Sequence, residues 1–251
     1  AEVEYHDKKA TTIWVKFPVA SGGPEDASVV IWTTTPWTIP ANQAVSFNPN
    51  ISYGLYEVTE VQSEEELGFK PWVDPGDKLL VADALAETVL GAAKASSWKK
   101  VESVDPTGWT LKHPFHGADW ADGYWDHDIP LLAGDHVTDD AGTGFVHTAP
   151  AHGEDDYLVF LKNGNSARDI RDIVGPAGEY RDEVPRFAGM DISGKVQQTA
   201  AGPFAGKVRF AGSGINGSAD LSAQGQYQHA EVDARASNAV IPGTAGLTIG
   251  R

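Results

Sequence analysis

The sequence Trp32-Thr33-Thr34-Thr35-Pro36-Trp37-Thr38-Ile39-Pro40-Ala41-Asn42 follows an apolar segment, residues 28–31, that is typical of a buried strand. Side chains alternate along a strand, so consecutive threonines are expected to present hydroxyl groups on both faces of its end. The first proline should end the strand, because it lacks the backbone N–H that a sheet ladder needs. The pattern suits recognition of an uncharged polar group such as an ester or a ribose. It also fits an ordinary edge of a β core, where threonine and tryptophan are common.

Short apolar or alternating segments elsewhere in the first 195 residues predict further strands. A helix capped by Asp83 is expected next, because Leu85, Val89 and Ala92 repeat at helical spacing. A second helix should begin at residue 154, where acidic side chains favour a helix N-terminus. The expected strands are 13–19, 28–35, 44–47, 53–58, 78–81, 129–132 and 144–148. Many strands and few helices predict an α+β fold with a closed or nearly closed, β-barrel-like core and peripheral helices.

The composition changes near Lys195, which predicts a domain over residues 1–195 and a separate tail over 196–251. The tail is rich in Gly, Ala and Ser, and its period-two runs are typical of a β-rich or poorly ordered segment. Residues 212–217 match the Gly-x-Gly-x-x-Gly pattern of dinucleotide sites. That pattern requires a helix next, whereas residues 218–225 alternate like a strand, so we interpret the match as accidental.

The bulk composition excludes several classes of protein. The 251-residue chain has no Cys, which excludes a disulfide framework, a thiolate metal site and a cysteine nucleophile. Its formal net charge of −16 argues against general nucleic-acid binding, which needs clustered Lys and Arg, although one local site remains compatible with it. No apolar run is long enough to span a membrane and no signal peptide is visible, so we expect a cytoplasmic protein without a membrane partner.

A second informative segment covers residues 142–157, where a predicted strand carries His147 and a predicted helix then begins at carboxylates. A metal site at His147, His152, Asp155 and Asp156 is conceivable, but the spacing matches no metal motif and the carboxylates have a helix-capping role available. We therefore expect no metal. Alternatively, a helix carboxylate could pair with a substrate ammonium, with His147 as steric wall, hydrogen-bond partner or general base. His113 and His116 are interpreted as loop or turn histidines.

The two segments together resemble the editing domain of isoleucyl-tRNA synthetase. The threonine run, residues 32–42, precedes residues 142–157 by about a hundred residues, and residues 4–7, 11–18 and 132–143 also fit the family. Related leucyl and valyl enzymes have an arginine and an acidic residue around the proline, where this chain has Thr35 and Trp37, which favours the isoleucyl member. The resemblance covers residues 1–194 and implies a β-barrel-like editing domain.

The resemblance implies an aminoacyl-tRNA deacylase that hydrolyses valine from mischarged tRNA(Ile). One methylene in an apolar pocket discriminates by only ~1–3 kcal/mol, and isoleucine against valine is the standard case of this limit. The implied partners are the 3′ end of aminoacylated tRNA(Ile), its valine moiety and the remainder of the synthetase; no cofactor is implied. Residues 196–251 do not resemble the family's return to the catalytic domain or its second ATP signature, so no aminoacylation is expected from this chain alone.

The resemblance also implies roles for eight residues. The implied catalytic residues are Thr33, Thr34, Thr35 and Asp156, and the implied substrate-binding residues are Trp37, Thr38, Asn42 and His147. The threonines would line the ester and terminal ribose and hold the attacking water, while Asp156 would pair with the α-ammonium. His147 would reject the longer isoleucine, and whether it or a substrate hydroxyl is the base stays open. Asn42 would support the pocket, and Trp37 and Thr38 would form its wall.

A different class of function also fits the sequence. The chain could be a non-catalytic β-rich binding or structural module in which the charge-poor tail is the functional part. This alternative rests on the tail's composition and on the absence of a Gly-x-Ser-x-Gly nucleophile motif or a Walker-type loop.

Overall fold

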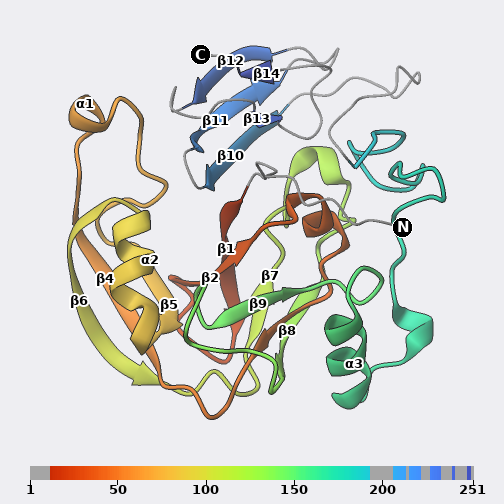
Figure 1. Ribbon diagram of the computed structural model, residues 1–251, viewed down its shortest axis with the longest axis horizontal. Helices are drawn as coiled ribbons and strands as arrows, with labels where there is room; N and C mark the ends of the chain where they lie inside the picture. The colour runs from red at the N-terminus through yellow and green to blue at the C-terminus, as the bar shows by residue number, and fades with distance from the viewer. Residues whose placement is uncertain are drawn as a thin grey trace, which may run out of the picture.

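The structure, a computed structural model, describes residues 12–192 in full and the backbone of several strands beyond them (Figure 1). Those strands form a three-stranded antiparallel sheet and a two-stranded one. They are β10 (Gly206–Gly212), β11 (Ile215–Leu221), β12 (Tyr227–Val232), β13 (Ala239–Val240) and β14 (Thr248–Ile249). β11 begins at Ile215, inside the dinucleotide-type pattern of residues 212–217, and continues past it, where a true site would have a helix. The resembling segments at residues 4–7 and 11 lie outside the described residues.

Nine strands form the main sheet, in the order β6-β4-β5-β2-β1-β7-β8-β3-β9. Neighbouring strands are antiparallel except for the pairs β2/β5 and β3/β8, which are parallel. The strands are β1 (Ile13–Ser21), β2 (Ala27–Thr33), β3 (Ala44–Phe47), β4 (Tyr53–Val61), β5 (Lys78–Ala82), β6 (Ala95–Val104), β7 (Thr110–Lys112), β8 (Asp128–Ala133) and β9 (Phe145–Thr148). The predicted mixture of many strands and few helices is therefore confirmed.

The sheet is open, so the predicted closure into a barrel is wrong. Within residues 12–192, no ladder joins the edge strands β6 and β9. The sheet curls instead: the backbone N–H of Ala82 donates to the carbonyl of Thr143 at 2.9 Å, and the Tyr53 hydroxyl donates to the carbonyl of Gly144 at 2.8 Å. β9 is four residues long, is followed by Pro150 after one further residue, and forms a ladder with β3 alone among the strands of residues 12–192.

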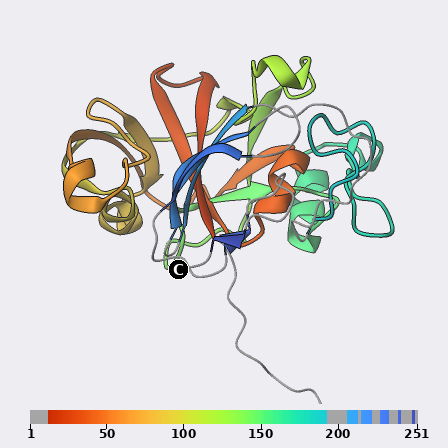
Figure 2. The same ribbon diagram turned by 90° about the horizontal axis from the view of Figure 1, so that it is seen from above.

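Three α-helices are peripheral to the sheet: α1 (Glu64–Leu67), α2 (Ala86–Ala92) and α3 (Glu154–Lys162). Figures 1 and 2 show α2 beside β4, β5 and β6 and α3 on the opposite side of the molecule. α2 forms where helical spacing predicted it, but Asp83 does not cap it, because its carboxylate instead accepts from the Tyr56 hydroxyl and binds Lys100. No helix of the described residues has the length and apolar character needed to cross a membrane.

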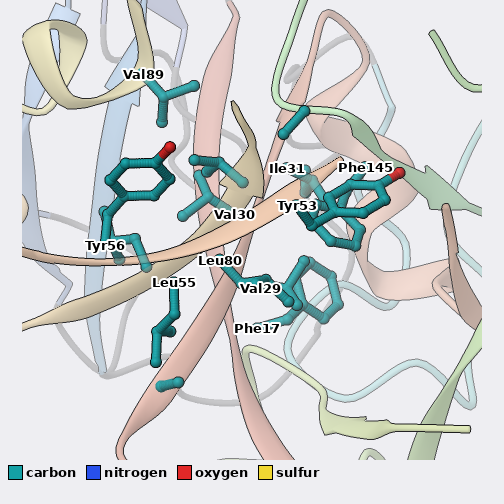
Figure 3. Close-up of a cluster of buried hydrophobic side chains, with 14 of the residues drawn as sticks. Phe17, Val29, Val30, Ile31, Tyr53, Leu55, Tyr56, Leu80, Val89 and Phe145 are labelled. Atoms are coloured by element: carbon teal, nitrogen blue, oxygen red, sulfur yellow. The ribbon is translucent and has the colours of Figure 1, made fainter. Parts of the chain in front are cut away.

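The main core lies between the curled sheet and α2 (Figure 3). Val30 and Leu80 on neighbouring strands and Val89 on α2 are fully buried, and complete burial of such side chains contributes about 1.5–3 kcal/mol each. The ring centroids of Tyr53 on β4 and Phe145 on β9 lie 4.6 Å apart, so β9 packs against β4 across the curled sheet. This packing therefore fixes the position of β9 in the core.

A second cluster, rich in aromatic residues, packs against residues 36–41, the segment that follows β2. Trp125 and Tyr180 are at its centre, with Phe115, Trp120 and Phe187 around them. His113 belongs to it as well: its ring stacks on Trp125 at 5.5 Å and its side chain is 1% exposed. His113 and His116 both lie in the loop that follows β7, as the sequence predicted. His113 is nevertheless buried by aromatic side chains from distant parts of the chain, whereas His116 is exposed.

Candidate active site

The threonine run turns away from the sheet earlier than the sequence predicted. β2 ends at Thr33, and Pro36 occupies the first turn of a 3₁₀ helix, η1 (Pro36–Ala41). The Thr33 hydroxyl accepts from the backbone N–H of Thr35 at 3.1 Å and lies 3.2 Å from the Thr35 hydroxyl. This local bond competes with continuation of the strand, and proline favours a helix start. Thr34 and Thr35 are consequently exposed at the surface, whereas Thr33 is buried.

His147 joins the two segments that the sequence singled out. It lies on β9 opposite Val45 of β3, and its ring Nε2 is 2.9 Å from Oγ1 of Thr38 on η1. Its Nδ1 is 2.7 Å from Nδ2 of Asn42, the residue that ends η1. All three side chains are buried. The structure thus brings together Thr38, Asn42 and His147, which we call the Thr–His–Asn network.

The proton positions in the Thr–His–Asn network follow from its other bonds. The Thr38 hydroxyl donates its one hydrogen to the Thr35 carbonyl at 2.8 Å, so it must accept from His147 Nε2–H. The Asn42 amide donates to the Ala44 carbonyl at 2.7 Å, which fixes its orientation and makes it a donor to His147 Nδ1 as well. His147 is therefore the neutral Nε2–H tautomer. Asn42 Oδ1 is a buried acceptor without a partner among the described residues.

Burial lowers the pKa of His147 to about 3, with the nearby His152 as a second cause. Because Nδ1 already accepts from Asn42, the ring has no lone pair left for a substrate proton. His147 is thus a rigid neutral wall or hydrogen-bonding group in this arrangement. The geometry argues against the general-base role that the sequence left open.

Asp156 lies in the first turn of α3, and its side chain contacts the loop between β9 and α3. Its Oδ2 accepts from the backbone N–H of Ala149 at 2.8 Å. Burial raises the pKa of this carboxyl, while the Ala149 bond opposes the rise. This bond ties α3 to the loop that follows β9. α3 has no side-chain capping hydrogen bond at its N-terminus, so the capping role predicted for its carboxylates is not observed, and none of the recorded hydrogen bonds of Asp156 reaches the threonines.

Trp37 provides a further contact between the two segments. Its ring meets that of His152 edge-on, with 5.2 Å between centroids. The backbone N–H of Gln43 donates to the Thr148 carbonyl at 3.0 Å, which ties the end of η1 to the end of β9. Thr34 is exposed, and neither Thr34 nor Asp156 has a recorded hydrogen bond to the Thr–His–Asn network.

The four candidate metal ligands do not converge. Both nitrogens of His147 are engaged by Thr38 and Asn42, and Asp156 is engaged by Ala149. In the fully described part of the chain, no three His, Asp or Glu side chains are grouped as a metal would require.

A cavity of about 400 Å³ lies elsewhere, at the other end of β3. Its walls include Phe47, Tyr53, Asp83 and Pro106 and share no residue with the Thr–His–Asn network. The Thr–His–Asn network, by contrast, is made of buried polar groups from both segments that the sequence singled out.

Acidification provides a test of the buried histidine. Because burial lowers the pKa of His147 from its ordinary 6.5 to about 3 in the folded state, the unfolded chain binds its proton first as the pH falls. His147 thus contributes stability that is present above pH 6.5 and is lost as the pH falls toward 3. In urea unfolding, the free energy of unfolding of the wild type should fall between pH 7 and pH 5 by roughly 2 kcal/mol more than that of His147→Gln, which lacks the titrating group. The exposed variant His116→Gln is the control; equal pH dependence in wild type and His147→Gln would contradict the assignment.

Several residues that support the site could not be recognised from the sequence. The Ser46 and Thr148 hydroxyls form a buried pair at 2.7 Å between β3 and β9. Tyr180, His113 and Trp125 hydrogen-bond the backbone of η1. These partners are 74 to 143 residues from η1, and no local pattern indicates such contacts.

Comparison with known proteins shows extensive similarity over most of the chain. It is 57% identical over 194 residues to an isoleucine–tRNA ligase of Caulobacter vibrioides, covering 76% of this chain and 19% of that protein. An isoleucine–tRNA ligase of Rhodopseudomonas palustris is 45% identical over 205 residues, with the same two coverages. The chain spans about a fifth of the length of these relatives. No family model matches it.

Solved structures with some likeness include GlLeuRS-CP1, at 14% identity and a TM-score of 0.43 over 63% of this chain and 66% of that one. Another is the editing domain of the P. falciparum cytosolic leucyl-tRNA synthetase with insertions deleted, at 10% identity and a TM-score of 0.44 over 64% of this chain and 74% of that one.

The mixed sheet and its buried Thr–His–Asn network thus occur in a chain that is homologous to aminoacyl-tRNA synthetases over three quarters of its length. Within that class the similarity is to isoleucine–tRNA ligases, as the two sequence motifs predicted.

Proposed function

We propose that this domain is a hydrolytic proofreading module that cleaves the ester of valine mischarged onto tRNA(Ile). The observation that carries the proposal is the meeting of the threonine segment and the His147 segment in one buried network, within a chain 57% identical to an isoleucine–tRNA ligase. The implied partners are the aminoacylated 3′ end of the tRNA and the remainder of a synthetase.

In this proposal the exposed end of the threonine run receives the substrate. The hydroxyls of Thr34 and Thr35 lie at the surface, and Thr33 orients Thr35 through their 3.2 Å contact. Hydroxyl groups both donate and accept, so they suit an ester carbonyl, a ribose hydroxyl and an attacking water at once. Holding that water beside the ester supplies part of the barrier reduction through positioning alone.

Asp156 provides the charge that the α-ammonium of the amino acid needs. One carboxylate can accept several hydrogen bonds, so the Ala149 bond leaves capacity for an ammonium. His147 excludes the longer side chain of isoleucine, because both of its nitrogens are bound and the ring cannot swing aside without breaking two hydrogen bonds. Since His147 has no lone pair free, a hydroxyl of the terminal ribose is the base most compatible with the site. Ester hydrolysis by this route involves no metal, cofactor or covalent intermediate.

The deciding experiment is deacylation of Val-tRNA(Ile), with Ile-tRNA(Ile) as the control substrate. We expect the valyl ester to be cleaved and the isoleucyl ester to be spared, because a second sieve must admit the smaller side chain. The chain truncated after Gly194 should show the same selectivity if the tail is not the functional part. A folded sample that cleaves neither ester would refute the proposal, and activity lost with the tail would favour the alternative module.

A further inference from the structure

Three carbonyl groups of η1 accept hydrogen bonds from side chains far away in the sequence. Each donor comes from a different segment of the chain, and all three belong to the aromatic cluster. The bonds are Tyr180 hydroxyl to Trp37 carbonyl at 2.7 Å, His113 Nε2 to Ile39 carbonyl at 3.0 Å, and Trp125 Nε1 to Pro40 carbonyl at 3.0 Å. We call these three donors the η1 clamp.

The η1 clamp supplies donors that the backbone cannot supply. In a 3₁₀ helix the carbonyl of Trp37 would bond to the N–H of residue 40, but Pro40 has no N–H. The carbonyl of Pro40 would bond to the N–H of Gln43, but that N–H donates to Thr148 on β9. Tyr180 and Trp125 fill these two positions. Without them two carbonyls under the helix would be left unpaired, at a cost of about 1–3 kcal/mol each where they are buried.

The clamp is also rigid. Tyr180, Trp125 and His113 are each at most 1% exposed, so their rings are held by packing on all sides. His113 Nδ1 accepts from the backbone N–H of Phe115 at 3.1 Å, which leaves Nε2–H as the donor to Ile39. Because these side chains are rigid, their three hydrogen bonds fix both the position of η1 and its rotation about its own axis.

η1 in turn carries the groups that hold His147. Thr38 lies between the two carbonyls bound by Tyr180 and His113, and its hydroxyl accepts from His147 Nε2–H. Asn42 ends η1 and donates to His147 Nδ1. A shift of η1 therefore shifts both groups that fix the histidine ring.

We propose that Tyr180, with Trp125 and His113, is a positioning residue that sets the Thr–His–Asn network for catalysis by holding η1. This inference rests on the proposed deacylase function. It adds a residue that neither contacts the threonine hydroxyls nor was indicated by the sequence.

The test is Tyr180→Phe, which removes one hydroxyl and keeps the ring. We expect kcat for Val-tRNA(Ile) deacylation to fall about 10-fold with KM within about twofold of wild type, because misplacement by a fraction of an ångström affects the chemical step more than binding. The ring ¹⁵N resonances of His147, which report its Nε2–H tautomer, should move in the same variant. Tyr56→Phe is the matched control, since Tyr56 is a buried tyrosine whose hydroxyl also donates a hydrogen bond, to the Asp83 carboxylate at 2.7 Å, and has no recorded bond to η1 or β9.

An unchanged kcat, or unchanged His147 resonances, in a folded Tyr180→Phe protein would overturn the positioning role. Equal effects in Tyr56→Phe would do the same, because they would indicate a general loss of packing. If wild type itself cleaves no ester, the proposed function fails, and the His147 resonances still decide whether Tyr180 positions the network. Trp125→Phe removes the Nε1 donor and repeats the test should the first variant not fold.

Discussion

Asp156→Asn should reduce kcat/KM for Val-tRNA(Ile) deacylation about 100-fold. The amide keeps an oxygen that can accept from the Ala149 N–H, so the 2.8 Å bond that caps the loop before α3 can persist. The substitution removes only the negative charge proposed to pair with the substrate ammonium. Truncating one partner of a buried charge pair costs about 2–5 kcal/mol, which corresponds to a loss of this order or larger. Steady-state deacylation kinetics give the ratio directly.

Asp155→Asn is the matched control for this prediction. Asp155 precedes Asp156 in the same helical turn but is exposed, so its charge is screened by solvent. Its substitution should leave kcat/KM within about twofold. Comparable losses in both variants would indicate a general electrostatic effect at the start of α3 and would count against a specific ammonium contact.

Burial also raises the pKa of Asp156, which adds a pH dependence to the same prediction. Because the ionised carboxylate is the proposed partner, activity should fall on acidification at pH values above the usual aspartate range. Asp156→Asn should lack this acidic limb. An acidic limb that survives in the variant would assign the titration to another group.

His147→Ala should allow the isoleucyl ester to be hydrolysed. The imidazole is 7% exposed and fixed between Thr38 and Asn42, so its removal opens space that no rotamer change of the wild-type ring provides. Rejection of one extra methylene is worth about 1–3 kcal/mol, so discrimination between the two esters should fall about 10- to 100-fold. The measurement is the ratio of kcat/KM for Val-tRNA(Ile) to that for Ile-tRNA(Ile).

The variant also leaves the Thr38 and Asn42 polar groups without their partner, so a lower stability is expected alongside the change in selectivity. His152→Ala is therefore a useful control: it removes a partly buried histidine from the same segment, one that contacts Trp37 but not the Thr–His–Asn network. It should preserve the preference for valine. A selectivity ratio that does not change in His147→Ala would refute the sieve role.

Local sequence patterns predicted some features of the site and missed others. The sequence predicted one site from residues 32–42 and 142–157, and the structure joins Thr38, Asn42 and His147 of these segments, while no recorded hydrogen bond links Asp156 to the threonines at 33–35. The end of β2 was misplaced by two residues, because the turn depends on the bond between the Thr33 hydroxyl and the Thr35 N–H. Barrel closure was misjudged because strand number alone does not fix which edges pair.

The sequence by itself determined the mixed architecture with few helices, the absence of thiol chemistry and the homology to isoleucine–tRNA ligases. These properties follow from composition, periodicity and motif spacing, which are local. Only the tertiary structure decided the tautomer of His147, its unsuitability as a base, and the η1 clamp of Tyr180, His113 and Trp125. Each of these depends on hydrogen bonds between residues 74 or more positions apart, and the partner of a buried donor or acceptor is fixed by packing of the whole domain.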